Sequence, residues 1–185
     1  MRRTTTFLGL ATSLLAGSVA LALRQESLPP PQPSAEHAQV MRLVGTWTVT
    51  VKSGDQTEAE KSTITFERIG EYWVTGRWHG TYMGLPFDGQ STQGYSPTKK
   101  KMIATWVDSR TPEVGLGEGT WDPATSTMRI SWECATKPDQ PSASETVVFH
   151  DDDHFTATMS MRGPDGEERP PMTLEYVRKG SVPER

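Results

Sequence analysis

The stretch GTWTVTV, residues 45–51, decides the fold, because large apolar residues alternate in it with small polar ones. Successive side chains of a β-strand point to opposite faces, so Trp47, Val49 and Val51 share one face. A strand with one apolar and one polar face is typical of a sheet that covers a core on one side only. The stretch therefore predicts a half-buried strand over residues 46–51, within an antiparallel sheet.

The same alternation recurs down the chain. It predicts further strands at 64–66, 72–78, 102–107, 128–134, 146–149, 155–161 and 172–178. Segments rich in Gly, Pro, Ser and Asp separate the strands, at 53–55, 96–98, 122–124, 151–153 and 163–166. About nine or ten strands joined mostly by short hairpins form a meander, and closure into a barrel removes its exposed edges. We therefore predict an all-β antiparallel barrel, with an open sandwich as the alternative.

The residues before the first strand have a different composition. Arg2 and Arg3, followed by the apolar stretch 7–23 and an Ala-Leu-Ala cleavage site at 20–22, predict a secretory signal peptide and an exported, periplasmic or secreted protein. An uncleaved membrane anchor is the alternative, because about 20 apolar residues can cross a bilayer. The expected division is a signal peptide at 1–22, a proline-rich linker at 23–36, a barrel domain at 37–180 that begins with a short helix within residues 37–44, and a tail at 181–185.

The charge balance argues against nucleic acid as a partner. The 185 residues include 19 Lys and Arg against 23 Asp and Glu, for a formal charge of -4. Phosphate binding needs clustered basic residues, and the one dense run, at 99–101, is predicted to be a solvated hairpin turn. The single cysteine, Cys134, allows no disulfide within the chain, so a packed core must stabilise the domain. Its shared strand face with Trp132 predicts a buried, unreactive thiol.

Gly45-Thr46-Trp47 opens the first strand directly after the predicted helix, and Arg178 ends the last strand. This arrangement resembles the Gly-x-Trp motif and the closing arginine of the lipocalin superfamily. The resemblance implies that Arg178 lies across Trp47 and closes one end of the barrel. A guanidinium over an indole is a favourable cation–π pair of about 0.5–2 kcal/mol. Gly45, Trp47 and Arg178 are therefore the expected closure residues.

A longer set of motifs runs through the middle of the chain. Met-Gly-Leu-Pro-Phe-Asp-Gly at 83–89, Gly-Tyr-Ser at 94–96, Lys-Lys-Met at 100–102 and Thr-Trp-Val-Asp-Ser at 105–109 closely resemble the bacterial family called domain of unknown function 1579. Gly-Thr-Trp-Asp at 119–122 and Leu-Glu-Tyr-Val-Arg-Lys at 174–179 are similar to it as well. The sequence departs from the family at Ser96, where Asp is frequent, and at Trp121, where Tyr is usual. The resemblance implies a lipocalin-like barrel, frequently exported, without an established activity.

Alternation also predicts which residues face the barrel interior. Barrels of about eight to ten strands either fill with side chains or keep a cavity for one small ligand. Aromatic and methionine walls suit an apolar ligand. The candidates for a ligand-binding wall, for which core packing alone is the other interpretation, are Trp78, Met102, Trp106, Trp132 and Met159.

Three polar features admit both a chemical and a structural interpretation. Asp108 follows Trp106 by two positions and is predicted to face a ligand or act as a base, or else to cap a turn. His150 and His154 flank three aspartates, which is compatible with a metal site but typical of a hairpin turn. His79 is a potential haem ligand, yet it lies on the opposite strand face from Trp78 and is expected to point outward.

The leading hypothesis is a non-enzymatic binding module for a small apolar or amphipathic molecule, with Asp108 and the aromatic residues at its site. No metal site, no cofactor and no membrane association after signal cleavage are expected, and the oligomeric state is left open. The alternatives are an enzyme that uses the barrel as an active-site pocket, and an interaction protein with a filled barrel. A binding module and an enzyme both require a cavity, whereas an interaction protein requires an exposed apolar patch.

Overall fold

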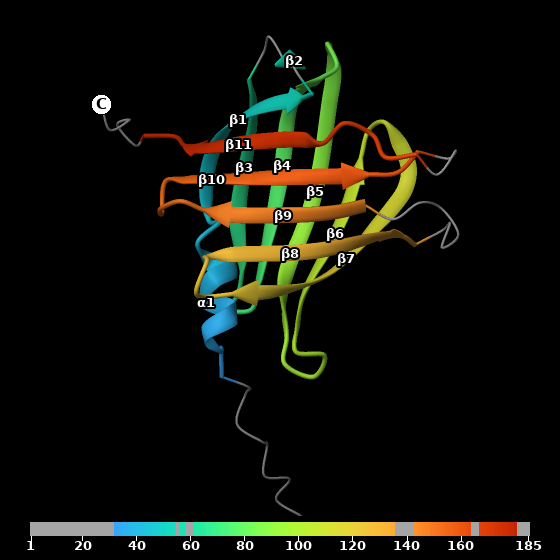
Figure 1. Ribbon diagram of the computed structural model, residues 1–185. Helices are drawn as coiled ribbons and strands as arrows, with labels where there is room; N and C mark the ends of the chain where they lie inside the picture. Colours follow the sequence, from blue (N-terminus) through green and yellow to red (C-terminus); the bar gives the residue numbers. More distant parts are fainter. Residues whose placement is uncertain (1–31, 55, 58–60, 136–142, 164–166, 181–185) are drawn as a thin grey trace, which may run out of the picture. The chain divides into compact units, whose positions relative to one another are not determined.

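The fold was analysed in a computed structural model of the chain, and the description covers residues 32–54, 56–57, 61–135, 143–163 and 167–180. The predicted signal peptide, most of the predicted linker and the tail lie outside these residues. The described part contains a seven-residue helix and eleven strands (Figure 1). They are α1 (Ala35–Met41), β1 (Gly45–Ser53), β2 (Gln56–Thr57), β3 (Ser62–Ile69), β4 (Trp73–Tyr82), β5 (Leu85–Ser96), β6 (Lys101–Asp108), β7 (Thr111–Asp122), β8 (Thr127–Cys134), β9 (Ala143–Phe149), β10 (His154–Met161) and β11 (Met172–Arg178).

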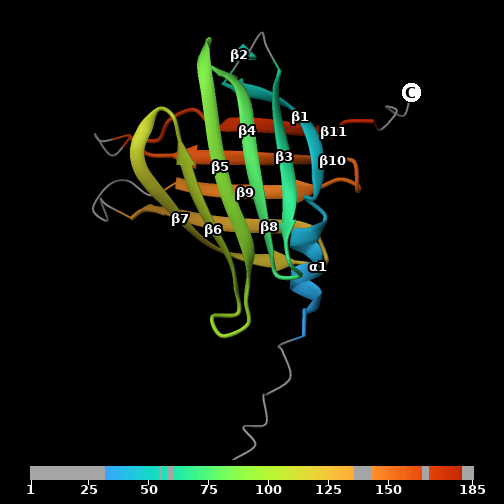
Figure 2. The same ribbon diagram turned by 180° about the vertical axis from the view of Figure 1, so that it is seen from behind.

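The strands form a closed antiparallel barrel. From β3 to β11 each strand pairs with the next one along the chain, and β1 pairs with β3 on one side and with β11 on the other. In the described residues the barrel therefore has ten strands, with β2 as a short addition at the edge of β1. Figures 1 and 2 show β8 to β11 crossing β3 to β5 steeply on the opposite side. The prediction of a closed barrel with a short N-terminal helix is confirmed, and the open sandwich is excluded because β1 and β11 pair directly.

Two strands lie where the alternation of apolar residues does not indicate one. β5 and β7 each span 12 residues, and neither is among the segments predicted from apolar alternation. Glycine and polar residues replace the apolar partners on their inner faces, for example at Gly89, Ser91 and Gly117. These positions are small because a neighbour occupies the space: a Cβ built on Gly117 would lie 2.8 Å from Ile130 Cγ2 and one built on Gly89 2.5 Å from Trp106 Cζ2. Packing partners from other strands supply the missing apolar surface.

The helix begins at Ala35, two residues before the expected start of the domain, and ends at Met41. Its first turn is stabilised by His37, whose Nδ1 accepts a hydrogen bond from the Ser34 main-chain N–H at 2.9 Å. The His37 ring is buried and meets Tyr72 and Tyr95 edge-on, with ring centroids 5.3 Å and 5.5 Å away. These contacts attach the helix to the loop before β4 and to β5, so the helix belongs to the barrel domain.

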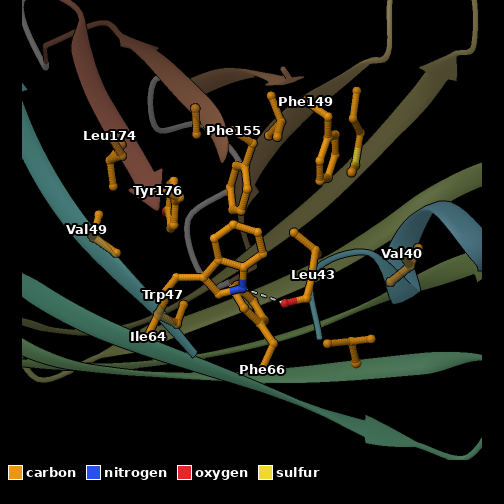
Figure 3. Packing of buried hydrophobic residues seen from close by; sticks show 14 of the residues in the cluster. Val40, Leu43, Trp47, Val49, Ile64, Phe66, Phe149, Phe155, Leu174 and Tyr176 are labelled. Atoms are coloured by element: carbon orange, nitrogen blue, oxygen red, sulfur yellow. Dashed lines mark hydrogen bonds between the residues drawn. The ribbon is translucent and has the colours of Figure 1, made fainter. Parts of the chain in front are cut away.

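The core centres on Trp47, whose side chain is fully buried. Its Nε1 donates a hydrogen bond to the Leu43 carbonyl at 2.7 Å, which connects β1 to the chain just after α1 (Figure 3). Phe155 meets the indole edge-on at 4.7 Å and stacks on Tyr176 at 4.1 Å. Aromatic pairs of this kind add about 0.5–1.5 kcal/mol beyond the area they bury. The base of the barrel is therefore filled with side chains.

Arg178 lies across Trp47 at this base, in the contact that the resemblance implied. Its guanidinium lies 4.2 Å from the centre of the Trp47 ring and donates hydrogen bonds to the carbonyls of Val44 and Arg42 at 2.6 Å and 3.1 Å. Gly45 has a φ of +133° and lies directly under the guanidinium, where a built Cβ would overlap Arg178 Nη1. Both fixed residues of the Gly-x-Trp motif therefore contribute to the closure: Trp47 binds the guanidinium, and Gly45 leaves room for it.

Candidate functional site

A cavity of about 480 Å³ occupies the part of the barrel away from the Trp47 core. Each long strand contributes one end to it: Val51 lines the cavity whereas Trp47 does not, and Trp132 lines it whereas Met128 is buried in the core. The exposed residues Arg110 and Thr111 also belong to the lining, so the cavity opens to solvent at the β6–β7 turn. The volume lies within the usual range for small-molecule sites, about 300–1,000 Å³.

Aromatic side chains form one wall of the cavity. Phe87 and Trp106 stack with centroids 6.3 Å apart and planes 19° apart, and Trp78 meets Phe87 edge-on at 6.0 Å. Trp106 packs closely against Gly89 of the neighbouring strand, since a Cβ at Gly89 would be 2.5 Å from its ring. This packing fixes the indole planes without filling the space in front of them.

Trp106 and Asp108 form the first of two indole–carboxylate pairs. Trp106 Nε1 donates to Asp108 Oδ2 at 2.8 Å, and Asp108 Oδ1 accepts the main-chain N–H groups of Arg110 and Thr111 at 2.8 Å and 3.1 Å. Asp108 thus lines the cavity and caps the β6–β7 turn at the same time. Because each carboxylate oxygen is already hydrogen-bonded, the residue is better placed to orient Trp106 than to act as a base.

Trp132 and Glu145 form the second pair, across β8 and β9. Trp132 Nε1 donates to Glu145 Oε2 at 2.8 Å, and Oε1 has no hydrogen-bond partner among the described residues. Burial raises the pKa of the Glu145 carboxyl above its usual range, and the Trp132 hydrogen bond opposes that rise only in part. Burial and then the neighbouring charge of Glu145 raise the pKa of the Tyr176 hydroxyl. Glu145 is partly accessible, and the space it faces is the cavity.

Two further polar atoms at the cavity wall lack partners. Trp78 Nε1 and Ser91 Oγ are both buried, and neither has a hydrogen-bond partner within the described part of the chain. The residues are diagonal neighbours on adjacent strands, because Trp78 pairs with Gly89 and Ser91 follows two positions later. An unsatisfied buried polar group costs about 1–3 kcal/mol, so native structures rarely keep two side by side without a reason.

The structure brings together five of the six residues that we predicted for the ligand wall. Trp78, Trp106, Asp108, Trp132 and Met159 all line the cavity. Met102 does not, and its placement there is a correction: it points inward as expected but is 3% exposed in the packed core at the base. Alternation indicates the face of a strand and not the depth along it, and eight residues span roughly 27 Å of barrel.

Glu145, Ser91 and Phe87 also line the cavity, although none of them was predicted from the sequence. A signal existed for Glu145, since it shares a strand face with Val147 and Phe149, which are both buried. Ser91 and Phe87 lie on β5, which was not recognised as a strand. Cys134 also needs a correction, because it is partly accessible and lines the cavity, where its Sγ contacts Glu113 Oε2 at 3.6 Å.

The histidines lie outside the cavity. His79 is exposed on the outer face of β4, where its Nδ1 is 2.7 Å from Asp88 Oδ1. His150 and His154 flank the β9–β10 turn, with rings 4.6 Å apart. No three metal-binding side chains come together in the part of the chain that the structure describes. Among the same residues, no helix has both the length and the apolar character needed to span a membrane.

Comparison with solved structures supports the fold. The crystal structure of Rv2717c from M. tuberculosis matches with a TM-score of 0.57 and 10% identity, over 80% of this chain and 99% of that one. The S-type phycobiliprotein lyase CPES from Guillardia theta matches with a TM-score of 0.54 and 16% identity, over 81% and 100%. No curated protein matches the chain.

The family comparison agrees with the motifs and with the barrel. The model described as "Protein of unknown function (DUF1579)" matches residues 32–178, which span the described helix and the whole barrel. This match shows that the chain belongs to the DUF1579 family, and the closed strand order with the Trp47–Arg178 contact shows a lipocalin-like barrel.

Proposed function

We propose that the barrel binds one small, largely apolar molecule in its cavity, and that it does so after export from the cytoplasm. The observation that supports binding best is the contrast between the two ends of the barrel. The base is packed around Trp47, whereas the other end keeps about 480 Å³ of space between aromatic side chains. A barrel that needed only a core would gain stability by filling that space, because unfilled volume loses packing energy.

The unpartnered Trp78 Nε1 and Ser91 Oγ support the same proposal. Both belong to the cavity lining. A polar group of a bound molecule would satisfy their hydrogen bonds, as a water molecule would before the ligand displaces it. An enzymatic role has weaker support, since Asp108, our candidate base, already accepts three hydrogen bonds. The binding module is therefore the function that the geometry favours.

The proposal is tested with phenylnaphthylamine, an uncharged dye whose emission rises in apolar surroundings, titrated into the full chain. We expect saturable enhancement at micromolar dye. The variant Gly115→Leu should weaken binding by about tenfold or more, because a Cβ at Gly115 lies 3.5 Å from both Trp106 and Trp132 and the leucine would fill the space between them. Thr120→Leu is the matched control, since Thr120 is exposed on the same strand.

Trp106→Ala provides a second variant should the leucine disturb folding, and it should also weaken binding because it removes the stacked wall. Circular dichroism verifies that each variant is folded. The proposal would be refuted if the wild-type chain gave no saturable signal. It would also be refuted if folded Gly115→Leu and Trp106→Ala bound the dye as tightly as Thr120→Leu.

A further inference from the structure

The cavity carries an excess of negative charge. Among the described residues that line it, four carry carboxylates and Arg110 is the one basic side chain. Arg110 is exposed, on the turn at the opening, where water screens its charge. Walls of one sign around a space of low dielectric raise the local concentration of oppositely charged ligands and repel like-charged ones. The four carboxylates belong to Asp108, Glu113, Glu133 and Glu145.

Glu145 is the carboxylate with the least compensation. Asp108 accepts three hydrogen bonds, Glu113 contacts Cys134, and Glu133 is exposed to water. Glu145 has one neutral donor, Trp132 Nε1, and its Oε1 has none among the described residues. A charge taken out of water is costly unless an opposite charge or several hydrogen bonds replace the lost hydration. Among the described residues that line the cavity, none supplies Glu145 with an opposite charge or with further hydrogen bonds.

The surroundings of Glu145 suit a cation as well. Trp132 holds the carboxylate, and Tyr176 is close enough for the Glu145 charge to act on its hydroxyl. Trp78 meets the Tyr176 ring edge-on with centroids 6.3 Å apart, so aromatic rings continue across this side of the cavity. Aromatic faces attract ammonium groups, and the attraction grows when both are removed from water. A carboxylate beside aromatic rings therefore offers two favourable interactions to one positive charge.

We propose that the molecule bound in this cavity is an organic cation, an amine with an apolar body whose ammonium group pairs with Glu145 Oε1 while the body lies against the tryptophans. This inference rests on the proposed binding function and specifies its ligand class. It also predicts that fatty acids and other apolar anions are poor ligands, because their carboxylates would approach Glu145 and Asp108.

The test uses three probes that share one ring system and differ in charge: naphthylmethylamine, naphthylmethanol and naphthoate. Isothermal titration calorimetry of the full chain at neutral pH gives the dissociation constant of each. We expect the amine to bind roughly tenfold to a hundredfold more tightly than the alcohol, the range for a hydrogen bond between charged groups. The naphthoate should bind more weakly than the alcohol.

Glu145→Gln is the decisive variant, because the amide keeps the size of the side chain and an oxygen that can accept the Trp132 hydrogen bond. It should remove most of the preference for the amine while changing the affinity for the alcohol by less than about twofold. Glu118→Gln is the matched control. Glu118 lies on the outer face of β7, paired with Lys99 and Lys101, so its loss changes the net charge equally without touching the cavity.

The outcomes separate this inference from the function on which it rests. If the alcohol binds and the amine binds no more tightly, or if Glu145→Gln leaves the preference intact, the cation is the wrong ligand class and the binding function stands. If naphthoate binds best, the inference is likewise overturned. If phenylnaphthylamine and all three probes fail to bind, the proposed function itself is refuted.

Discussion

Replacement of Arg178 by methionine tests the account of barrel closure most directly. Methionine keeps an unbranched apolar side chain that can still pack on Trp47, but it removes the charge and every N–H donor. The guanidinium lies 4.2 Å from the Trp47 ring centre and 2.8 Å from Asp153 Oδ1. The perturbation therefore removes one cation–π contact, one ion pair and a set of hydrogen bonds at the point where β1 and β11 join.

The expected loss of stability follows from these contacts. The cation–π pair contributes about 1–2 kcal/mol when partly removed from water. The Asp153 ion pair contributes at most about 1 kcal/mol, because both side chains keep contact with solvent. Hydrogen bonds from a charged donor contribute about 1.5 kcal/mol each, but contacts that share one group are not additive. These hydrogen bonds run from the guanidinium to the main-chain carbonyls of Val44 at 2.6 Å, Arg42 at 3.1 Å and Asp152 at 2.7 Å. For all these contacts together we expect a loss of about 3–5 kcal/mol in the free energy of unfolding.

Urea unfolding followed by tryptophan fluorescence measures the loss as a change in the free energy of unfolding. The slope of that free energy with urea should stay constant, as it does when a variant changes stability and not compactness. Arg77→Met is the control, because Arg77 is exposed on the outer face of β4, and we expect a change within about 0.5 kcal/mol. A loss below about 1 kcal/mol for Arg178→Met, or an equal loss for both variants, would refute the reasoning.

Three further predictions concern the core, the strand packing and the buried carboxylate. Trp47→Ala should lower the free energy of unfolding by about 3–5 kcal/mol, since the side chain is fully buried, and urea unfolding will show it. Gly119→Ala should destabilise by about 1–3 kcal/mol because its Cβ would overlap the Arg129 carbonyl, whereas Gly115→Ala, with its nearest neighbour at 3.5 Å, should stay within about 0.5 kcal/mol; thermal unfolding of the pair compares them. The raised pKa of Glu145 means that the folded state holds this proton more tightly than the unfolded state, so its contribution to stability is present below the ordinary value of 4.5 and is lost as pH rises. Glu145→Gln should therefore match the wild type in urea unfolding at low pH and exceed it at neutral pH; equal curves at both would contradict the burial of this charge.

Much of the fold could be predicted because its signals are local. The period of two in β1 places Trp47, Val49 and Val51 on one face, and all three are buried in the structure. Successive side chains of any β-strand point to opposite faces, so this alternation does not depend on which strands are its neighbours. β5 and β7 were not predicted from apolar alternation because their inner faces carry glycine and serine, whose apolar neighbours belong to other strands.

The candidate site could be predicted only in part. The inward direction of Trp78, Trp106 and Trp132 follows from alternation, and all three line the cavity. Depth does not follow from it, which is why Met102 was assigned to the wall although it lies in the base. The pairing of Trp132 with Glu145 depends on the register of β8 against β9, where Trp132 faces Ala143.

The sequence by itself determined the class of fold and the inward face of most strands, because strand periodicity acts through neighbouring residues. Its resemblance to the lipocalin superfamily indicated the residues that close the barrel. The tertiary structure alone decided where the barrel is filled and where it is hollow. That outcome depends on strand register, on the stagger of ten strands around a closed sheet and on which side chains meet at each depth. It also placed the Glu145 carboxylate in a cavity of low dielectric, and the charge selectivity that we propose for this site arises from that placement.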